Sequence, residues 1–487
     1  MVLTSSLAAR LQEIVAALAR AKGLYADVRW VHQQQESLIV QNGAVHHLAS
    51  SVSEGCAIRV LADGAWGYAS SSQMTGAGLH ATARRALEMA RACARVNRER
   101  VLFPSLPPQR GSYRTPVEVD PFTVEHSKKL DYLFWANRVL RDHPSIQTAT
   151  TALEFFRTEK LFLSTEGSRL HQEIVESGAS MEAIAVLDGE VQRRSYPAGN
   201  GACLAQAGYE YVKRLDLVGQ AARVRQEAVA LLRAKECPSG VTTVILMPDQ
   251  LALQLHESCG HPIELDRVLG QELSFAGGSF LDPAKLGRFH YGSPLVNSTA
   301  DAACWHGVGT FGYDDEGVPA QTAPVVREGL FVGYLSSRES AARLHLASSG
   351  AMRADGWNAM PLVRMTNVNL EPGTGTLEEL IRDTRRGLLL ATNKSWSIDD
   401  RRLNFQFGTE IAWEIRGGKL GSVYKNPVYT GITPKFWGAC SGIAGPAAWT
   451  LYGVHNCGKG EPMQTMHTGH GASPARFERV QVGRSRG

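Results

Sequence analysis

The chain of 487 residues is long enough for two to four domains of about 100 to 200 residues each, and its 44% of hydrophobic residues is too high for a disordered protein. The 51 Lys and Arg residues exceed the 47 Asp and Glu residues by only 4, so the basic surface typical of a nucleic-acid-binding protein is not expected. The eight cysteines stand singly, without a C-x-x-C pair. They predict free thiols in a reducing compartment, and hence a cytoplasmic protein.

The first predicted element is an amphipathic helix over residues 5–22, where apolar residues recur at spacings of three and four. Arg10, Glu13 and Arg20 interrupt these apolar residues, whereas a signal peptide needs an unbroken apolar core. The sequence contains no run of about 18 uncharged apolar residues, the length that a membrane-spanning helix needs. We therefore expect neither a secretory signal nor a membrane span.

Two β-hairpins are predicted next. Asn42-Gly43 and Asp63-Gly64 are two-residue turn sequences, which favour hairpins because both turn positions need a positive φ. The flanking strands are expected as short separate segments at 26–31, 38–41, 44–48, 56–61 and 65–69. A helix over 78–96 follows, and the proline-containing stretch 103–110 has the composition of a linker.

A second unit repeats the order of helix and strands. It consists of a helix near 124–141, strands between 146 and 196, and a helix near 215–235. The turns between its strands are too short to contain crossover helices, which disfavours a parallel sheet and predicts an α+β fold. We expect an N-terminal α+β domain over 1–236, with a subdivision near 103–120, and a β-rich C-terminal domain over 237–487 that carries the chemistry.

A possible metal site begins after the apolar, β-branched residues 241–247. Pro248-Asp249 predicts the start of a helix with Asp249 as its N-cap, and this helix leads into His256-Glu257-Ser258-Cys259-Gly260-His261. The resulting H-E-x-x-x-H sequence is one residue longer than the zincin motif. Histidines four apart lie about 40° apart around a helix, but histidines five apart lie about 140° apart and cannot face one ion. We therefore predict that the helix bulges or ends between them, as Gly260 and Pro262 favour.

A catalytic zinc site usually has three protein ligands and one open position, so one more ligand must come from elsewhere in the chain. Four residues near the C-terminus are candidates: His455, Cys457, His467 and His470. Cys457 is favoured because a thiolate binds Zn²⁺ well and Gly458 allows the backbone to approach closely. The sequence alone does not exclude the three histidines.

At these residues the chain resembles the TldD members of the TldD/PmbA family of metallopeptidases, also called modulator-of-gyrase proteins. The resemblance extends through nearly the whole chain. The matching stretches are 256–261, 314–319 (Asp-Asp-Glu-Gly-Val-Pro), 364–367 (Arg-Met-Thr-Asn), 395–400 (Ser-Trp-Ser-Ile-Asp-Asp), 405–410 (Phe-Gln-Phe-Gly-Thr-Glu) and 456–459 (Asn-Cys-Gly-Lys).

The resemblance implies a ligand set and an assembly. It assigns one Zn²⁺ per chain to His256, His261 and Cys457, and the role of catalytic base to Glu257. It implies a peptidase of unfolded or modified peptides that works as a dimer, either of identical chains or with a PmbA/TldE-like paralogue that lacks the metal motif. The alternative hypothesis is a non-catalytic peptide-binding or regulatory subunit with a structural zinc. The glutamate beside the histidine pair favours the enzyme, because a structural site does not need it and usually closes with a fourth protein ligand.

The remaining notable residues are expected to be structural. Cys259 is interpreted as a small buried apolar residue, and Cys440 lacks the strand-turn-helix context of a nucleophile. The acidic trio Asp314, Asp315 and Glu316 precedes a glycine and predicts a turn on a solvated edge. Arg364 is interpreted as an ordinary structural arginine.

Overall fold

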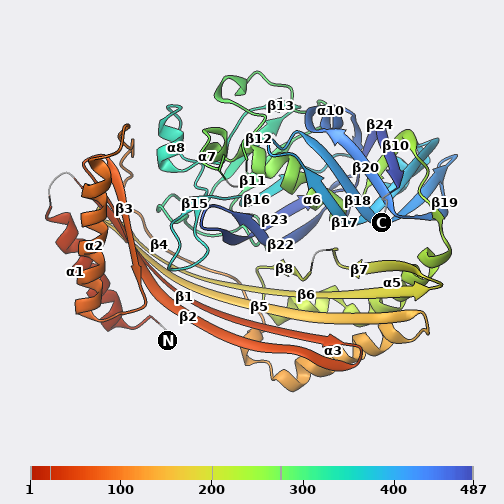
Figure 1. Ribbon diagram of the computed structural model, residues 1–487, viewed down its shortest axis with the longest axis horizontal. Coiled ribbons are helices and arrows are strands. Elements are labelled where there is room, and N and C mark those ends of the chain that lie inside the picture. The colour runs from red at the N-terminus through yellow and green to blue at the C-terminus, as the bar shows by residue number, and fades with distance from the viewer. Residues whose placement is uncertain (1–2, 22–23, 200, 275–276, 485–487) are drawn as a thin grey trace.

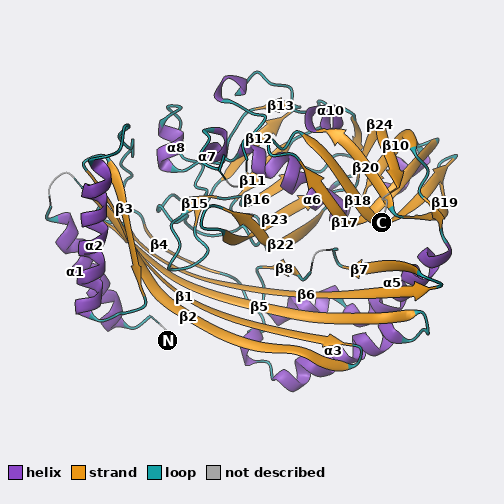
Figure 2. Cartoon of the chain, in the orientation of Figure 1, coloured by secondary structure: helices purple, strands orange, loops and turns teal. Residues whose placement is uncertain are grey.

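The computed structural model describes residues 3–21, 24–199, 201–274 and 277–484. It contains helices and predominantly antiparallel sheets, which confirms the predicted α+β class (Figure 2). Within these residues, no helix combines the length and the apolar character needed to cross a membrane. The division into domains at residue 237 stays a prediction.

The N-terminal half is built on one long, curved sheet, which lies along the lower side of Figure 1. Its strand order is β3-β2-β1-β5-β6-β4, and β7 and β8 also pair with β6. Only β4 runs parallel to its neighbour. The strands are β1 (Tyr25–Gln41), β2 (Ala44–Ala62), β3 (Ala65–Ser71), β4 (Arg110–Arg114), β5 (Ile146–Ser164), β6 (Arg169–Leu187), β7 (Glu190–Tyr196) and β8 (Cys203–Ala205).

The predicted hairpin turns are confirmed. Asn42 and Gly43 have φ values of 50° and 78°, and Asp63 and Gly64 have 55° and 85°, as two-residue hairpins require. The expectation of separate strands at 26–31 and 38–41 is wrong, because both belong to β1. The polar residues between them stay in the strand because β2 and β5 flank β1 on both sides along its length, so its backbone groups are paired whatever its side chains are.

Helices cover the sheet in two places. The first predicted helix is α1, which ends at Ala19, while residues 22–23 lie outside the described part. Together with α2 it packs on the end of the sheet where β3 lies, and α3 and α5 pack under its middle and other end (Figure 1). The N-terminal helices are α1 (Ser5–Ala19), α2 (Gly76–Ala94), α3 (His126–Arg141), α4 (Tyr209–Leu215) and α5 (Leu217–Arg233).

The C-terminal half lies above the long sheet in Figure 1 and contains two sheets of more than two strands. In the first, the order β17-β10-β24-β20-β18 closes on itself because β17 also pairs with β18, and β19, β9 and β21 extend it. Its strands are β9 (Lys235–Glu236), β10 (Gly240–Leu246), β17 (Arg386–Ile398), β18 (Asn404–Arg416), β19 (Lys419–Lys425), β20 (Pro427–Ile432), β21 (Cys440–Ile443) and β24 (Ala475–Arg484).

The second of these sheets has the order β13-β12-β11-β16-β23-β22, which makes β22 an edge strand. Its strands are β11 (Ser298–Asp301), β12 (Thr322–Arg327), β13 (Leu330–Phe331), β16 (Asn367–Leu370), β22 (Thr450–Lys459) and β23 (Gln464–Ala472); β14 (Met352–Arg353) and β15 (Leu362–Val363) form a separate pair. The helices of this half are α6 (Pro248–Leu255), α7 (Leu265–Val268), α8 (Arg338–Ala342), α9 (Leu377–Arg382) and α10 (Thr433–Gly438).

Helix α6 lies between the two C-terminal sheets, where it contacts β17, β22 and β23. Its side chains Leu251 and Leu255 belong to the largest hydrophobic core of the molecule. Helix α6 is therefore held in place by packing against strands of both C-terminal sheets. This position places the H-E-x-x-x-H segment next to the edge strand β22.

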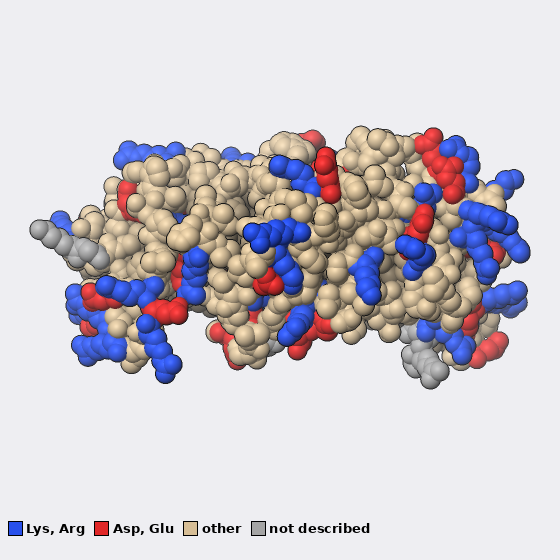
Figure 3. All heavy atoms as spheres, turned by 90° about the horizontal axis from the view of Figure 1, so that it is seen from above, with Lys and Arg blue, Asp and Glu red and all other residues tan. Residues whose placement is uncertain are grey.

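The surface carries charges of both signs. Figure 3 shows Lys and Arg side chains interspersed with Asp and Glu over the upper face, with the denser groups near the two ends of the molecule. Such a distribution agrees with the small net charge of +4.

Candidate metal centre

The predicted break between the two histidines is a π-helical segment. Helix α6 continues into a π-helix over His256–Gly260, in which the N–H of His261 bonds to the carbonyl of His256, and a 3₁₀ turn over His261–Ile263 follows. Because a π-turn spaces its hydrogen bonds five residues apart, residues five apart lie on one face of it. A glycine is needed at position 260, because a Cβ there would lie only 2.0 Å from Sδ of Met365, which packs against this segment.

The start of α6 differs from the prediction. The N-cap is Met247, which makes no side-chain cap, and Pro248 occupies the first turn. Asp249 is therefore inside the helix, where its carboxylate accepts hydrogen bonds from the N–H of Gln250 at 2.9 Å and from the hydroxyl of Thr392 at 2.6 Å. Proline is well suited to the first helical position because it has no N–H to satisfy, so the N-cap lies at Met247, two residues before the predicted Asp249.

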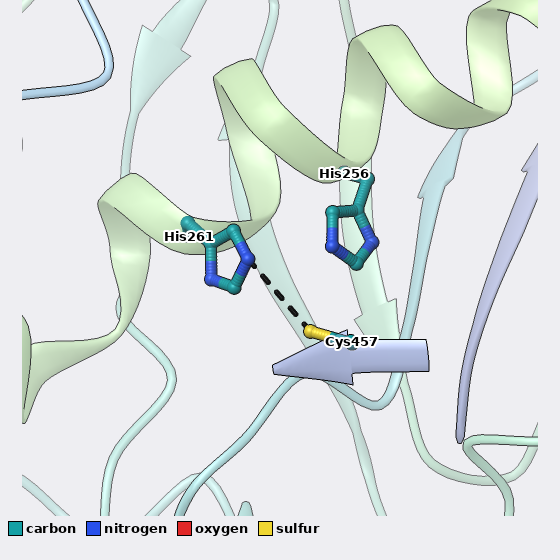
Figure 4. Close-up of side chains that lie close together, drawn as sticks. All are labelled: His256, His261 and Cys457. Carbon is teal, nitrogen blue, oxygen red and sulfur yellow. Dashed lines mark hydrogen bonds between the residues drawn. The ribbon is translucent and has the colours of Figure 1, made fainter. Parts of the chain in front are cut away.

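Two histidines and one cysteine converge on one point (Figure 4). Ligand atoms of His256, His261 and Cys457 all lie within 4.8 Å of one another, and Nε2 of His261 is 3.7 Å from Sγ of Cys457. All three residues are buried. The histidines come from the π-helical segment and its end, and Cys457 comes from β22, about 200 residues later in the chain.

A neighbouring histidine sets the orientation of His256. Nδ1 of His470 lies 3.1 Å from the carbonyl of Val368, which can only accept, so this nitrogen carries a proton. Nε2 of His470 lies 2.8 Å from Nδ1 of His256. Burial and then the charge of His256 lower the pKa of His470 well below its ordinary value, so His470 is neutral and its Nε2 accepts the proton of His256 Nδ1. Because Nδ1 of His256 donates to His470, Nε2 is the ring nitrogen of His256 that can bind a metal ion.

A buried carboxylate has the same effect on His261. Nδ1 of His261 lies 3.0 Å from Oε2 of Glu264, which leaves Nε2 of His261 on the side of Cys457. Burial opposes ionisation of Glu264, but Lys459 and His261, with Arg267, hold the pKa of Glu264 well below its ordinary value. Lys459 Nζ is 3.3 Å from the same oxygen. The ionised carboxylate therefore orients the imidazole that faces the thiol.

The thiol of Cys457 is poised to ionise. Burial alone would raise the pKa of Cys457, but the positive charge of Arg364 outweighs it, together with the two histidines, and the pKa lies well below its ordinary value. Arg364 is fully buried and donates a hydrogen bond to the carbonyl of Cys457. It is thus a structural arginine, as predicted, but one that also favours the thiolate, the form that binds metal ions.

Glu257 shares a cavity with the three converging side chains. This cavity of about 310 Å³ is lined by parts of α6, β22 and β17, and by Glu257 itself. The carboxylate of Glu257 accepts a hydrogen bond from Nη1 of Arg402, which lies in the turn between β17 and β18. Burial raises the pKa of Glu257, but the two histidines and Arg402 outweigh this and lower it, so the carboxylate is ionised. An ionised carboxylate in this cavity is able to accept a proton.

Two of the candidate histidines do not join the cluster. Nδ1 of His467 lies 2.6 Å from Glu176 of the long sheet, and Nδ1 of His455 lies 3.3 Å from the carbonyl of Ala202. Neither belongs to a group of described residues with converging metal-ligand atoms. The structure thus brings together Cys457 and the motif histidines, while His470 is the hydrogen-bond partner of His256.

Sequence reasoning did not find Glu264, Lys459 or Arg402. Glu264 lies three residues after His261, a spacing that a search for a carboxylate partner of His261 would find. Lys459 stands in the Asn-Cys-Gly-Lys stretch, but its partner lies in another element. Arg402 had no local signal, since its contact to Glu257 joins residues 145 apart in the chain.

The acidic trio is not a solvated turn. Asp314, Asp315 and Glu316 are each at most 4% exposed, which contradicts the prediction. Asp315 lies 3.3 Å from Lys160, and Glu316 lies 3.4 Å from Arg59, so cations of the long sheet cover two of the three carboxylates. The turn itself exists, but the N-terminal sheet packs over it.

The donor set fits a zinc ion. Zinc bound at about 2.0 to 2.3 Å in tetrahedral geometry holds its ligand atoms about 3.3 to 3.8 Å apart, and the distance of 3.7 Å between His261 and Cys457 lies within that range. Two imidazoles and a thiolate bind zinc well, whereas magnesium and calcium prefer oxygen ligands. The cavity beside them has space for a fourth ligand.

Family models match both halves of the chain. Residues 239–484 match the model described as the PmbA/TldA metallopeptidase C-terminal domain, and residues 26–90 match the one described as PmbA/TldA metallopeptidase domain 1. A metalloprotease from Methanocaldococcus jannaschii is 28% identical over 409 residues, which are 84% of this chain and 87% of that protein. A metalloprotease TldD homologue from Haemophilus influenzae is 24% identical over 468 residues, which are 94% of this chain and 92% of that protein.

Solved structures share the whole fold. A candidate modulator of a DNA gyrase from Thermotoga maritima superimposes with a TM-score of 0.76 at 19% identity, over 97% of this chain and 99% of that one. TldE from Thermococcus kodakarensis gives a TM-score of 0.74 at 15% identity, over 97% of this chain and 100% of that one.

Proposed function

Because the chain belongs to the PmbA/TldD family of metallopeptidases, we propose that it is a zinc-dependent peptidase in which His256, His261 and Cys457 hold one zinc ion and Glu257 is the general base. The observation that carries this proposal is the convergence of two imidazoles and a thiol beside an ionised carboxylate in one cavity. A structural zinc site has no need for such a carboxylate.

When bound by His256, His261 and Cys457, a zinc ion would supply Lewis acidity, which would polarise the scissile carbonyl and make the attacking water more acidic. Glu257 accepts the proton of that water and later delivers it to the nitrogen of the leaving amine. His470 and Glu264 hold the two imidazoles with their Nε2 atoms toward the cavity. Burial of the three proposed ligands restricts access of bulk water to the site.

We propose that the substrates are peptides in extended conformation. Support comes from β22, the edge strand of its sheet, which contributes both Cys457 and several cavity-lining residues. A peptide paired along such an edge would present its backbone, rather than particular side chains, to the cluster. Folded proteins usually protect the edges of their sheets, so the proposal is restricted to unfolded segments.

We further propose that the cytoplasm is the place of action and that the working form is a dimer, either of identical chains or with a TldE-like paralogue without the metal motif. The residues of β2 from Ala44 to Ser53 are all exposed and contain no Lys, Arg, Asp, Glu or Pro, the residues that usually protect a sheet edge. β3 pairs with β2 only from Cys56 onward, so this stretch is an unpaired edge. Val52→Lys should convert a dimer into a monomer in light scattering, whereas Val96→Lys, at an exposed site outside the strands, should not.

The decisive experiment compares wild type with Glu257→Gln. We expect about one zinc per chain in both proteins by elemental analysis, cleavage of an unfolded peptide by wild type, and a loss of about 10²- to 10⁴-fold in the variant. Full activity of Glu257→Gln would contradict the assigned base, and an active zinc-free preparation would contradict the metal. Bound zinc without cleavage, even with the paralogue added, would favour a peptide-binding subunit with a structural zinc.

A further inference from the structure

Arg402, the hydrogen-bond partner of Glu257, lines the cavity but has no part in the reaction steps proposed above. It lies in the turn between β17 and β18 and has a φ of 61°, which non-glycine residues seldom adopt. The turn is held in place by Asp399, whose carboxylate accepts hydrogen bonds from the N–H groups of Leu403 at 2.8 Å and Asn404 at 3.1 Å. The hydroxyl of Thr433 donates to the carbonyl of Arg402 at 2.8 Å. The main chain is thus fixed where the side chain enters the cavity.

The guanidinium of Arg402 is held less firmly than those of the structural arginines. Arg59 is 2% exposed and makes three hydrogen bonds to Asp27 and one to Glu316. The side chain of Arg402 is 16% exposed, bonds to Glu257 through Nη1, and has an Nε without a hydrogen-bond partner in the described part of the chain. An arginine of this kind has donors available for a second anion.

Arg402 is also the only Lys or Arg among the described residues that line the cavity. Peptide hydrolysis creates negative charge on the oxygen of the scissile carbonyl, and a preorganised donor for that oxygen is usually among the largest contributions to catalysis. We propose that Arg402 is a further catalytic residue, which binds this oxygen as it becomes negative. The proposal rests on the proposed function and adds to it the group that stabilises the transition state.

The charges balance at each step. When a water O–H bond breaks, its proton goes to Glu257, the water oxygen bonds to the carbonyl carbon, and the carbonyl π electrons move to the carbonyl oxygen. The carboxylate that holds Arg402 becomes neutral as this oxygen becomes negative, so Arg402 exchanges one anionic partner for the other. When the C–N bond breaks, the electrons return to re-form C=O, the proton passes from Glu257 to the amine nitrogen, and Arg402 pairs with Glu257 again.

The test combines peptide kinetics with binding of two inert analogues of one peptide. The first contains a phosphinate, which mimics the tetrahedral anion, and the second contains a neutral ketomethylene group, which mimics the unreacted bond. For Arg402→Gln we expect kcat to fall about 10²- to 10³-fold with KM within about threefold of wild type, and zinc content unchanged. Phosphinate affinity should fall by a similar factor, while ketomethylene affinity stays within about threefold.

The neighbouring Arg401, exposed in the same turn, provides the matched control, and Arg401→Gln should behave as wild type. Arg402→Lys keeps the charge without the planar fork, so it should recover part of both kcat and phosphinate affinity. Equal weakening of the two analogues in Arg402→Gln, or an unchanged kcat, would overturn the proposal.

A second readout does not depend on the zinc-loaded enzyme. After chelation of the metal, the wild type should still prefer the phosphinate to the ketomethylene analogue, and Arg402→Gln should lose this preference. If wild type cleaves no peptide, the proposed function and the catalytic role both fail, but the analogue pair still decides whether Arg402 has the role of binding an anion in this cavity. An Arg402-dependent preference supports that role, and equal binding by wild type and variant overturns it.

Discussion

The metal-centre cluster and the carboxylate cluster around Asp315 are both buried and both join distant parts of the chain, but their contacts differ in kind. In the carboxylate cluster the opposite charges are paired: Lys160 lies 3.3 Å from Asp315, and Arg59 lies 3.4 Å from Glu316. In the metal centre, ligand atoms of three residues instead face one another within 4.8 Å. Buried charged groups that are fully paired thus stabilise the structure, whereas buried donor atoms that converge on a common point indicate a candidate functional site.

The largest effect is expected in the carboxylate cluster. Asp315→Ala removes the partner of Lys160, whose side chain is only 18% exposed, and a contact to the buried Arg29. Breaking a buried pair from one side leaves an uncompensated charge, so the free energy of unfolding should fall by about 3 to 5 kcal/mol in urea denaturation. The exposed Glu378→Ala should change it by less than about 0.5 kcal/mol. Loss of zinc binding by the folded Asp315→Ala protein would show that the two clusters are not independent.

Cys457→Ser should have the next largest effect, on zinc affinity rather than stability. If each ligand contributes about a third of the 10 to 16 kcal/mol typical of a zinc site, the loss is about 4 kcal/mol, or roughly 1,000-fold in dissociation constant. Competition with a chromophoric chelator measures it. Cys440→Ser, a buried thiol outside the cluster, is the control and should bind zinc as wild type does. Undiminished affinity in Cys457→Ser would exclude this cysteine as a ligand.

A smaller loss of zinc affinity is expected for His470→Ala. Without His470, Nδ1 of His256 loses the acceptor 2.8 Å away that holds the ring in its orientation. Loss of such a partner typically weakens metal binding by about 10- to 100-fold. His467→Ala in the same strand is the matched control, because His467 contacts Glu176 instead. Similar losses in both variants would mean that the effect comes from β23 as a whole.

A second effect on stability in the carboxylate cluster is a dependence on pH. Burial and the charge of Glu316 raise the pKa of Asp314 to about 8, whereas an unfolded aspartate has a pKa of about 4. Between these values the folded protein holds a proton that the unfolded chain has lost, so this group stabilises the fold at low pH and its contribution declines as the pH rises toward 8.

Urea denaturation at several values between pH 5 and pH 8 measures this decline. Wild type should lose stability with rising pH relative to Asp314→Asn, which cannot titrate. Parallel curves for the two proteins would contradict the shifted pKa of Asp314.

Local patterns predicted most of the elements and the two histidines. The Asn-Gly and Asp-Gly turns needed only their own backbone preferences, and the spacing of five between His256 and His261 already required the distortion that the π-helix provides. The burial of the trio 314–316 could not be predicted in this way, since its polarity is that of a surface turn until cations from the long sheet cover it. The position of Asp249 inside α6, by contrast, has a local cause, because the neighbouring Pro248 occupies the first turn.

The α+β class, the hairpins and the helix-breaking geometry of the motif follow from local sequence patterns, and the family follows from resemblance. Three contacts depend instead on tertiary packing: Cys457 approaches His261, His470 supports His256 without joining the proposed ligands, and Arg402 reaches Glu257. The two groups of features differ in the distance along the chain over which their causes act. Turn and helix preferences act over a few residues, whereas these contacts join segments 145 to 214 residues apart, and their geometry follows from how two sheets and one short helix pack together.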